Sequence, residues 1–225
     1  MPSTGASRRH AACQARRTRF VCVADLHGFL PEIPVCDVLL VAGDICPTGD
    51  ETPGTQRRWL HSTFARWLAG VPARAVIGVA GNHEFVGEVD PGALRELDWH
   101  YLQDEGLELD GVTYYGSPWT APFQDWAFML DEDELARRWD AIPAGLDVLC
   151  VHSPPLGYGD EVGEFSIGSE SLLTAIDAQA PALCVYGHAH DGYGLRHRGA
   201  STLINAAYCG ADYRPAHQPI VFELG

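Results

Sequence analysis

Short apolar runs that end in polar, glycine-containing corners constrain the fold of this chain more than any other feature. The runs cover residues 20–24, 38–42, 75–80, 147–151 and 182–186. Uninterrupted apolar runs of this length, bounded by turn residues, are typical of central strands that are buried on both faces. The pattern therefore predicts a molecule built around buried strands, each followed by a polar turn.

The segments between and after these runs predict the rest of the architecture. Helical patterns cover residues 54–69, 91–98, 131–140 and 169–179, and further strands are predicted at 107–115, 193–198, 202–206 and 219–224. Some of these strands have no long helix between them, which indicates mixed pairing. We therefore predict an α/β fold, a four-layer αββα sandwich of two mixed β-sheets flanked by helices.

The acidic run that begins at Asp131 has two interpretations. It could bind a cation, or it could form the first turn of the helix predicted at 131–140. Carboxylates at a helix start face the positive end of the helix dipole, so the helix interpretation is favoured.

The domain organisation is simple. Residues 18–225 contain no linker, repeat or low-complexity stretch, and they predict a single domain. Residues 1–17 are rich in arginine and contain no acidic residue, and they predict a basic flexible tail of unassigned role. No apolar segment follows them, which argues against a secretory signal.

Charge and hydropathy exclude several classes of function. The net charge is -15 and all 15 basic residues are arginine, because the chain has no lysine. An acidic surface does not suit a long nucleic acid, and the absence of lysine excludes P-loop and Schiff-base chemistry. No apolar run approaches the roughly 18 residues of a membrane-spanning helix. A small phosphorylated substrate stays possible, because bound cations reverse the local field.

The cysteines favour a reducing compartment. The chain has 7 of them, scattered and without a CxxC pair, and most lie in apolar runs. Buried thiols of a cytoplasmic protein explain this distribution better than a disulfide framework or a zinc site.

Each polar corner carries residues that could bind a metal, but each also has a plainer interpretation. Asp25 and His27 alternate and so face the same way, yet such a triplet is common. Asp44 alone would usually make a turn or a helix cap. Asn82 and His83 behind a glycine are less expected in a plain turn.

The two later corners add histidines. His152 follows a buried strand and by itself would usually be a hydrogen-bonded core residue. His188 and His190 alternate after another strand, and their plainer interpretation is a pair of surface loop histidines. Ligands of α/β folds gather at the carboxyl ends of strands, where all of these corners lie. Their joint occurrence therefore predicts a site for divalent metals bound through nitrogen and oxygen.

The ordered corners resemble the calcineurin-like metallophosphoesterase superfamily, whose motifs run D-x-H, G-D, G-N-H-[DE], H and G-H-x-H. All of these motifs occur here between Asp25 and His190. Stretches such as 101–106, 115–119 and 213–215 make the sequence most similar to the metallophosphoesterase-domain-containing branch. The resemblance covers residues 18–225 and implies the fold of that superfamily.

The resemblance also implies how the site is divided. One metal would be held by Asp25, His27 and His190. The second would be held by Asn82, His152 and His188. Asp44 would bridge the two ions. His83 would bind no metal and would face the leaving group, so Asn82 and His83 would both contact substrate. Some members of this branch have glycine in place of the histidine found here at position 188, whereas this set is complete. Asp191 and Ser153 depart from the usual residues at their positions.

The implied activity is hydrolysis of a small phosphodiester, such as a cyclic nucleotide, by a metal-bridging hydroxide. Two divalent ions are implied, with Mn²⁺ or Fe favoured and Zn²⁺ or Mg²⁺ compatible. A phosphomonoesterase or pyrophosphatase with the same metals, and a weakly active nucleotide-binding regulatory module, are the alternatives. Among the aromatic residues of 114–128, Trp119, Phe123 and Trp126 could stack on a nucleobase or simply pack in the core. The oligomeric state is not predicted.

Overall fold

A computed structural model describes residues 17–225. The predicted basic tail, apart from Arg17, and Cys13 lie outside the described residues. The strands are β1 (Thr18–Val23), β2 (Cys36–Ala42), β3 (Ala73–Val79), β4 (His100–Tyr101), β5 (Glu105–Leu109), β6 (Val112–Ser117), β7 (Val148–Val151), β8 (Glu161–Val162), β9 (Phe165–Ser166), β10 (Leu183–Tyr186), β11 (Gly194–Arg198), β12 (Ser201–Asn205) and β13 (Ile220–Leu224). The helices are α1 (Pro53–Trp59), η1 (Leu60–Phe64), α2 (Ala65–Leu68), α3 (Phe85–Val89), α4 (Gly92–Arg95), α5 (Glu132–Trp139), α6 (Glu170–Gln179) and η2 (His190–Gly192).

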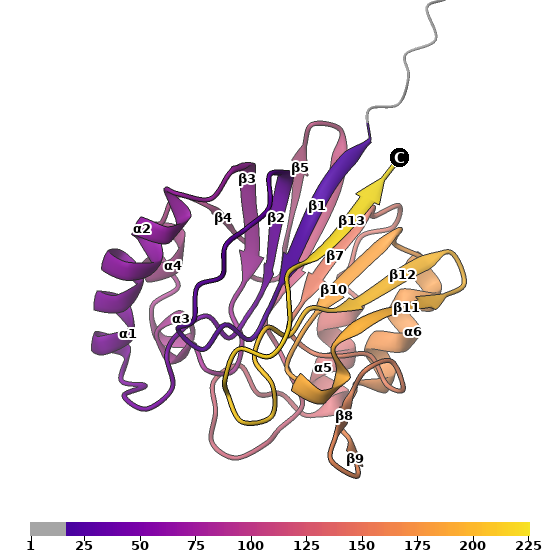
Figure 1. The fold of residues 1–225 in the computed structure, drawn as a ribbon. Coiled ribbons are helices and arrows are strands. Elements are labelled where there is room, and N and C mark those ends of the chain that lie inside the picture. The colour runs from indigo at the N-terminus through magenta and orange to yellow at the C-terminus, as the bar shows by residue number, and fades with distance from the viewer. Residues whose placement is uncertain (1–16) are drawn as a thin grey trace, which may run out of the picture.

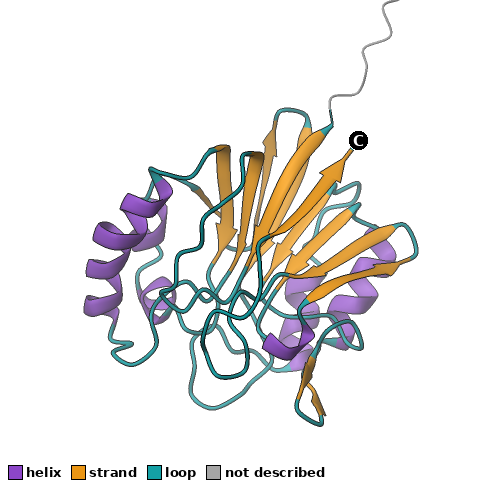
Figure 2. Ribbon diagram, in the orientation of Figure 1, coloured by secondary structure: helices purple, strands orange, loops and turns teal. Residues whose placement is uncertain are grey.

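The strands form two mixed sheets and a small hairpin. The first sheet has the order β13-β1-β2-β3-β4, the second has the order β11-β12-β10-β7-β6-β5, and β8 pairs with β9. The inner strands pair in parallel, whereas β13, β11 and β5 run antiparallel to their neighbours. Helices α1–α4 cover the outer face of the first sheet, and α5 and α6 cover that of the second (Figures 1 and 2). The predicted α/β fold with two mixed sheets flanked by helices is confirmed.

Burial on both faces of the strands explains why their sequences are apolar without interruption. In β1, Val21 and Val23 belong to the core beneath α1–α4, while Phe20 and Cys22 belong to the core between the sheets. A third core, which contains Trp139, lies between the second sheet and α5 and α6. Because alternate side chains enter different cores, no position in the inner part of the strand tolerates a polar residue.

The structure corrects several predicted boundaries. The strand predicted at 107–115 is two antiparallel strands, β5 and β6, joined at Asp110 and Gly111, which have φ values of 53° and 80°. An Asp-Gly pair suits such a two-residue turn because both residues tolerate positive φ. The helix predicted at 54–69 is present, with a π-helical stretch at Leu60–Phe64. The helix predicted at 91–98 is only the single turn of α4, and α3, β4, β8 and β9 were not predicted.

The acidic run and the cysteines behave as predicted. Asp131 caps α5, its side chain accepting a hydrogen bond from the Glu134 backbone N–H at 2.9 Å. The cysteines in the described part of the chain are free and buried. Within residues 17–225 no helix combines the length and the apolar character needed to cross a bilayer.

Candidate metal centre

The parallel strands of both sheets end on the same side of the molecule (Figure 1), and the predicted site residues follow those strand ends and lie close together. Asp25, Asp44 and Asn82 follow β1, β2 and β3 of the first sheet. His152 follows β7, and the two histidines of the last corner follow β10 of the second sheet. Sheet packing therefore brings together residues that lie far apart in the sequence, since His27 and His190 are separated by 163 positions.

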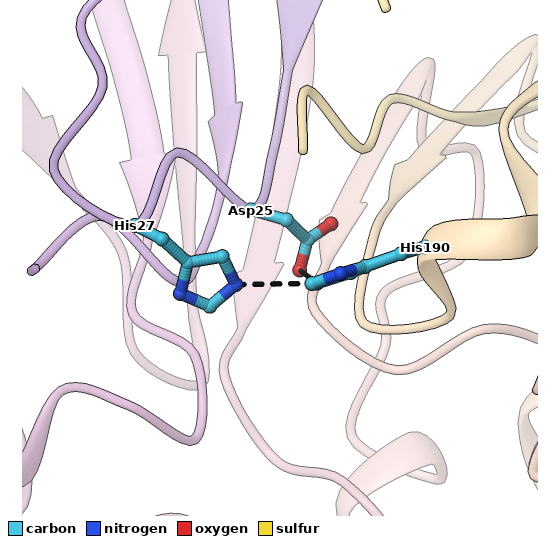
Figure 3. Close-up of side chains that lie close together, drawn as sticks. All are labelled: Asp25, His27 and His190. Atoms are coloured by element: carbon cyan, nitrogen blue, oxygen red, sulfur yellow. Dashed lines mark hydrogen bonds and ion pairs between the residues drawn. The ribbon is translucent and has the colours of Figure 1, made fainter. Parts of the chain in front are cut away.

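One group contains Asp25, His27 and His190, whose potential ligand atoms lie within 4.8 Å of one another (Figure 3). The Nε2 atoms of the two histidines are 3.1 Å apart, and Nε2 of His190 is 3.5 Å from Oδ1 of Asp25. The Nδ1 atom of His190 contacts the Gly210 carbonyl at 2.9 Å, which directs its Nε2 lone pair toward the group. A cation held between the two Nε2 atoms would explain their short separation better than a direct contact between the two imidazole rings does.

A second group contains Asp44, His152 and His188. The Nδ1 atom of His152 contacts the Ala42 carbonyl at 2.8 Å, and its Nε2 atom lies 2.9 Å from Oδ1 of Asn82. The backbone contact orients the ring, so Nε2 faces the site. Asn82 thus lies where its neutral oxygen could join this group.

The carboxylate of Asp44 lies between the two groups. Its Oδ1 is 3.4 Å from Nε2 of His152, and its Oδ2 is 3.8 Å from Nε2 of His27. Each oxygen therefore faces a histidine of a different group. This is the position that a bridging carboxylate requires.

Burial and neighbouring charges shift the pKa values of the candidate ligands in different directions. Burial lowers the pKa of His188 to about 3 and that of His27 to about 4, which favours the neutral imidazole that binds metals. Burial alone would raise the pKa values of Asp25 and Asp44, but neighbouring histidines hold both below the usual range. Against the effect of burial, Asp44 raises the pKa of His152 to about 9, so that histidine must lose a proton to bind a metal.

The donor atoms that face one another decide which ligand fits the site. Asp25, Asp44 and Asn82 offer oxygens there, and the Nε2 atoms of His27, His152 and His190 face the same groups. With a donor set of carboxylate, amide and imidazole groups, the residues present fit divalent ions.

The backbone at the site adopts unusual conformations, which the sequence did not predict. Asp25, His27, Asp44 and His188 have φ values of 51°, 43°, 52° and 68°. Non-glycine residues seldom adopt this region, and such strain gathers at functional sites. Position 81 requires glycine for a steric reason, because a Cβ at Gly81 would collide with the Asp44 carboxylate.

His83 forms a third group of potential ligand atoms with His27 and Asp44, and it is held by residues that no sequence motif pointed to. Its Nδ1 atom lies 2.6 Å from Oε1 of Glu51, and its backbone N–H donates to Oδ1 of Asp44 at 2.9 Å. The side chain of Gln56 donates to its carbonyl at 2.5 Å. Burial alone would lower the pKa of His83, but Asp44 and Glu51 raise it above the usual value. No sequence signal distinguished Glu51 from other acidic loop residues.

Glu84 is a second residue whose role the sequence did not reveal. Its buried carboxylate accepts hydrogen bonds from the backbone N–H groups of Gly81, Asp44, Ile45 and Cys46 at 2.7–2.9 Å. Burial and the charge of Asp44 raise its pKa to about 7, whereas the backbone donors oppose the shift. The Glu84 carboxylate thus connects the loop that follows β2 with the loop that follows β3.

Replacing Glu84 with glutamine is expected to destabilise the protein by about 2–4 kcal/mol, because the amide NH₂ would face backbone donors and leave them unsatisfied. Urea unfolding at a pH above the pKa of Glu84 measures this loss. Glu88→Gln is the matched control, since exposed Glu88 accepts only one bond, from the Phe128 N–H at 2.9 Å, which glutamine can keep. Equal stability of the two variants would contradict the tying role of Glu84.

A cavity of about 380 Å³ opens beside the site. Asp44, Asn82, His83, His188 and His190 form its polar part, and its apolar part is formed by Ala121, Pro122, Phe123, Trp126, Val162, Ile167 and Tyr213. Ser166 and Gly168 complete the lining, to which the unpredicted β8–β9 hairpin contributes. None of these lining residues is an arginine.

Of the two interpretations of Trp119, the structure favours packing. Trp119 is not among the residues that line this cavity, whereas Phe123 and Trp126 are. Its indole N–H donates to Oδ2 of Asp104 at 2.8 Å, and its ring packs edge-on against Phe128 at 5.2 Å. These contacts favour the packing interpretation over a substrate contact for this residue.

Comparisons with known proteins show the family to which the chain is similar. The family described as calcineurin-like phosphoesterase matches residues 18–192. Metallophosphoesterase domain-containing protein 1 of Homo sapiens is 34% identical over 238 residues, covering 92% of this chain and 71% of that protein. UPF0046 protein K07C11.7 of Caenorhabditis elegans is 33% identical over 225 residues, covering 92% and 75%.

Solved structures share the fold at low sequence identity. TT1561 of Thermus thermophilus has a TM-score of 0.58 at 15% identity and covers 84% of this chain and 89% of its own. Phosphopantetheinyl hydrolase of Mycobacterium tuberculosis also has a TM-score of 0.58 at 15% identity, with coverage of 86% and 90%. At this identity the likeness concerns the fold alone.

Proposed function

This chain belongs to the calcineurin-like phosphoesterase family, as its sequence suggested, and we propose that it is a dinuclear metal-dependent phosphodiesterase. Family membership supports the hydrolysis of a phosphoester. The substrate we propose is a small diester with a nucleotide-like group, such as a cyclic nucleotide. The observation that carries the proposal is the meeting of two ligand groups around Asp44 at the edge of an apolar cavity.

The proposed ligands follow from the two groups. Asp25, His27 and His190 would hold one ion. Asn82, His152 and His188 would hold the other. Asp44 would contact both ions. When bound, two divalent ions withdraw charge from a phosphoryl group and lower the pKa of a coordinated water. Mn²⁺ or Fe suits this mixed nitrogen and oxygen set, and Zn²⁺ and Mg²⁺ are the alternatives to test.

The residues around the ions would position the ester and transfer a proton. His83 lies within reach of both the cavity and Asp44, and Glu51 fixes its ring through Nδ1. Its Nε2 atom is then free to donate a proton to the departing ester oxygen. Asn82, which also lines the cavity, would orient the phosphoryl group.

The charge of the cavity favours a diester over a monoester or a pyrophosphate. A diester carries one negative charge at neutral pH, whereas a monoester carries nearly two. None of the cavity-lining residues is an arginine, so no guanidinium is in place for additional phosphate charge. The apolar side chains that line the cavity instead suit an uncharged ester group.

A panel of substrates tests the proposal. With Mn²⁺, the purified protein is expected to hydrolyse bis-p-nitrophenyl phosphate and cyclic nucleotides with kcat/KM at least about tenfold above that for p-nitrophenyl phosphate. A preference for the monoester or for pyrophosphate would favour the alternative enzyme class. Tight nucleotide binding with no turnover under any divalent metal would instead identify a regulatory module.

The proposed compartment is the cytoplasm. The cysteines of residues 17–225 are free and buried, as expected where thiols stay reduced. Cell fractionation tests this assignment.

A further inference from the structure

Tyr213 combines an unfavourable backbone conformation with a position over the candidate metal centre. Its φ value is 58°, in the left-handed region that bulky residues rarely occupy. The surrounding turn fixes this conformation, because the Tyr213 N–H donates to the Gly210 carbonyl and the Gly210 N–H donates to the Arg214 carbonyl, each at 2.9 Å. Glycine or asparagine would fit the same turn with less strain.

The ring of Tyr213 contacts the histidines of the site. Its centroid lies 4.7 Å from that of His27, 5.0 Å from that of His190 and 6.0 Å from that of His83. The ring of Trp126 also contacts His83, at 4.7 Å. Two aromatic side chains from distant parts of the chain therefore flank the residue that would face the leaving group.

Tyr213 also separates two hollows. It lines the main cavity, and it lines a second one of about 400 Å³ that contains His27, Phe29 and Arg214. The residue keeps 36% of its surface exposed, so part of the ring is available to a ligand. Removing the ring would take away part of the wall of both cavities.

We propose that Tyr213 is a specificity-determining residue whose ring packs against an aromatic or nucleoside ester group of the substrate. The inference rests on the proposed phosphodiesterase function. A strained bulky residue persists where it performs a task that the relaxed residue cannot. Here that task is apolar contact, because Phe123, Trp126 and Ile167 surround the same space and offer a planar group further burial.

Two substrates with the same leaving group isolate this contact. Phenyl p-nitrophenyl phosphate and methyl p-nitrophenyl phosphate both release p-nitrophenolate and differ in the group that remains on phosphorus. The wild-type protein is expected to prefer the phenyl ester by about tenfold or more in kcat/KM, the discrimination typical of an apolar wall. Tyr213→Phe should keep this preference, and Tyr213→Asn should reduce it to about one- to threefold.

Stability and metal content distinguish a substrate contact from a structural role. Tyr213→Asn should retain the wild-type metal content and unfold within about 4 °C of the wild type, since relief of strain offsets lost packing. Ala180→Gly calibrates that relief, because exposed Ala180 ends α6 with a φ value of 47° and lies away from the cavity. It should raise Tm and leave the substrate preference unchanged.

The outcomes separate the two proposals. If the wild type hydrolyses neither ester nor any other diester, the phosphodiesterase proposal fails. If the wild type is active and Tyr213→Asn keeps the phenyl preference, the role of Tyr213 is wrong. A large loss of Tm or of bound metal in Tyr213→Asn would assign the ring to structural support and would also overturn the inference.

Discussion

Replacing Asp44 with alanine is expected to remove both metal ions and to lower kcat by about 10³-fold or more. The side chain contributes the oxygens that face His152 at 3.4 Å and His27 at 3.8 Å, so its loss affects both ligand groups at once. Each ion supplies several kcal/mol of charge stabilisation to phosphoryl transfer, and every 1.36 kcal/mol corresponds to a factor of about ten in rate. Elemental analysis of the purified variant and turnover of bis-p-nitrophenyl phosphate measure the two effects.

A surface carboxylate provides the control for this substitution. Asp177 lies on α6, where it pairs with Arg198 at 2.7 Å on the exposed surface. Asp177→Ala should keep both ions and wild-type turnover, because exposed ion pairs contribute little. An Asp44→Ala protein with normal activity would be incompatible with a dinuclear centre.

Replacing His83 with alanine is expected to lower kcat by about 10²–10⁴-fold while leaving the metal content unchanged. The residue lines the cavity, and the proposed division of the ligands assigns it to neither ion, although its ring lies in one group with His27 and Asp44. Hydrolysis of a substrate whose leaving group needs no proton should be slowed less by the substitution. Comparing substrates with good and poor leaving groups therefore tests proton donation directly, and loss of metal in the variant would show that the assigned role is wrong.

Replacing Glu51 with glutamine distinguishes two effects of Glu51 on His83: the orientation of the ring and the influence of the negative charge. The glutamine can still accept a hydrogen bond from Nδ1 of His83, which lies 2.6 Å from Oε1 in the native protein. It removes, however, the negative charge that favours the protonated ring. We expect a loss of about tenfold or less, smaller than for His83→Ala, and pre-steady-state measurements of the chemical step would detect it.

The sequence predicted the layered fold because the strands are buried on both faces. In β1 and β2 the apolar residues form a continuous run, and each run indicates a strand that is buried on both faces. Helices α5 and α6 could be predicted because a capping residue precedes each of them. Short or half-exposed elements were missed or misjudged. The β8–β9 hairpin is mostly exposed and only a few residues long, so its hydrophobic pattern is too weak to detect.

Part of the candidate site could be predicted from the sequence. The polar corners indicated the candidate ligands, because ligand-type side chains rarely follow so many strands in this order by chance. Glu51 carried no sequence signal, because an acidic loop residue has no local mark that identifies its partner. Glu84 is the acidic residue of the G-N-H-[DE] motif, but the motif does not reveal which groups it contacts. Their roles come from contacts with His83 and with the backbone of the second corner.

By itself the sequence determined the family, the layered fold and the identity of the candidate ligands, because strand burial and strand-end motifs are local properties. The resemblance implied how those residues are grouped, but only the tertiary structure decided the distances between them. The packing of the two sheets sets how far Asp44 lies from His27 and His152, leaves Trp119 outside the cavity that Phe123 and Trp126 line, and brings Tyr213 over the site. These are relations between distant segments, and no local pattern encodes a distance across two sheets.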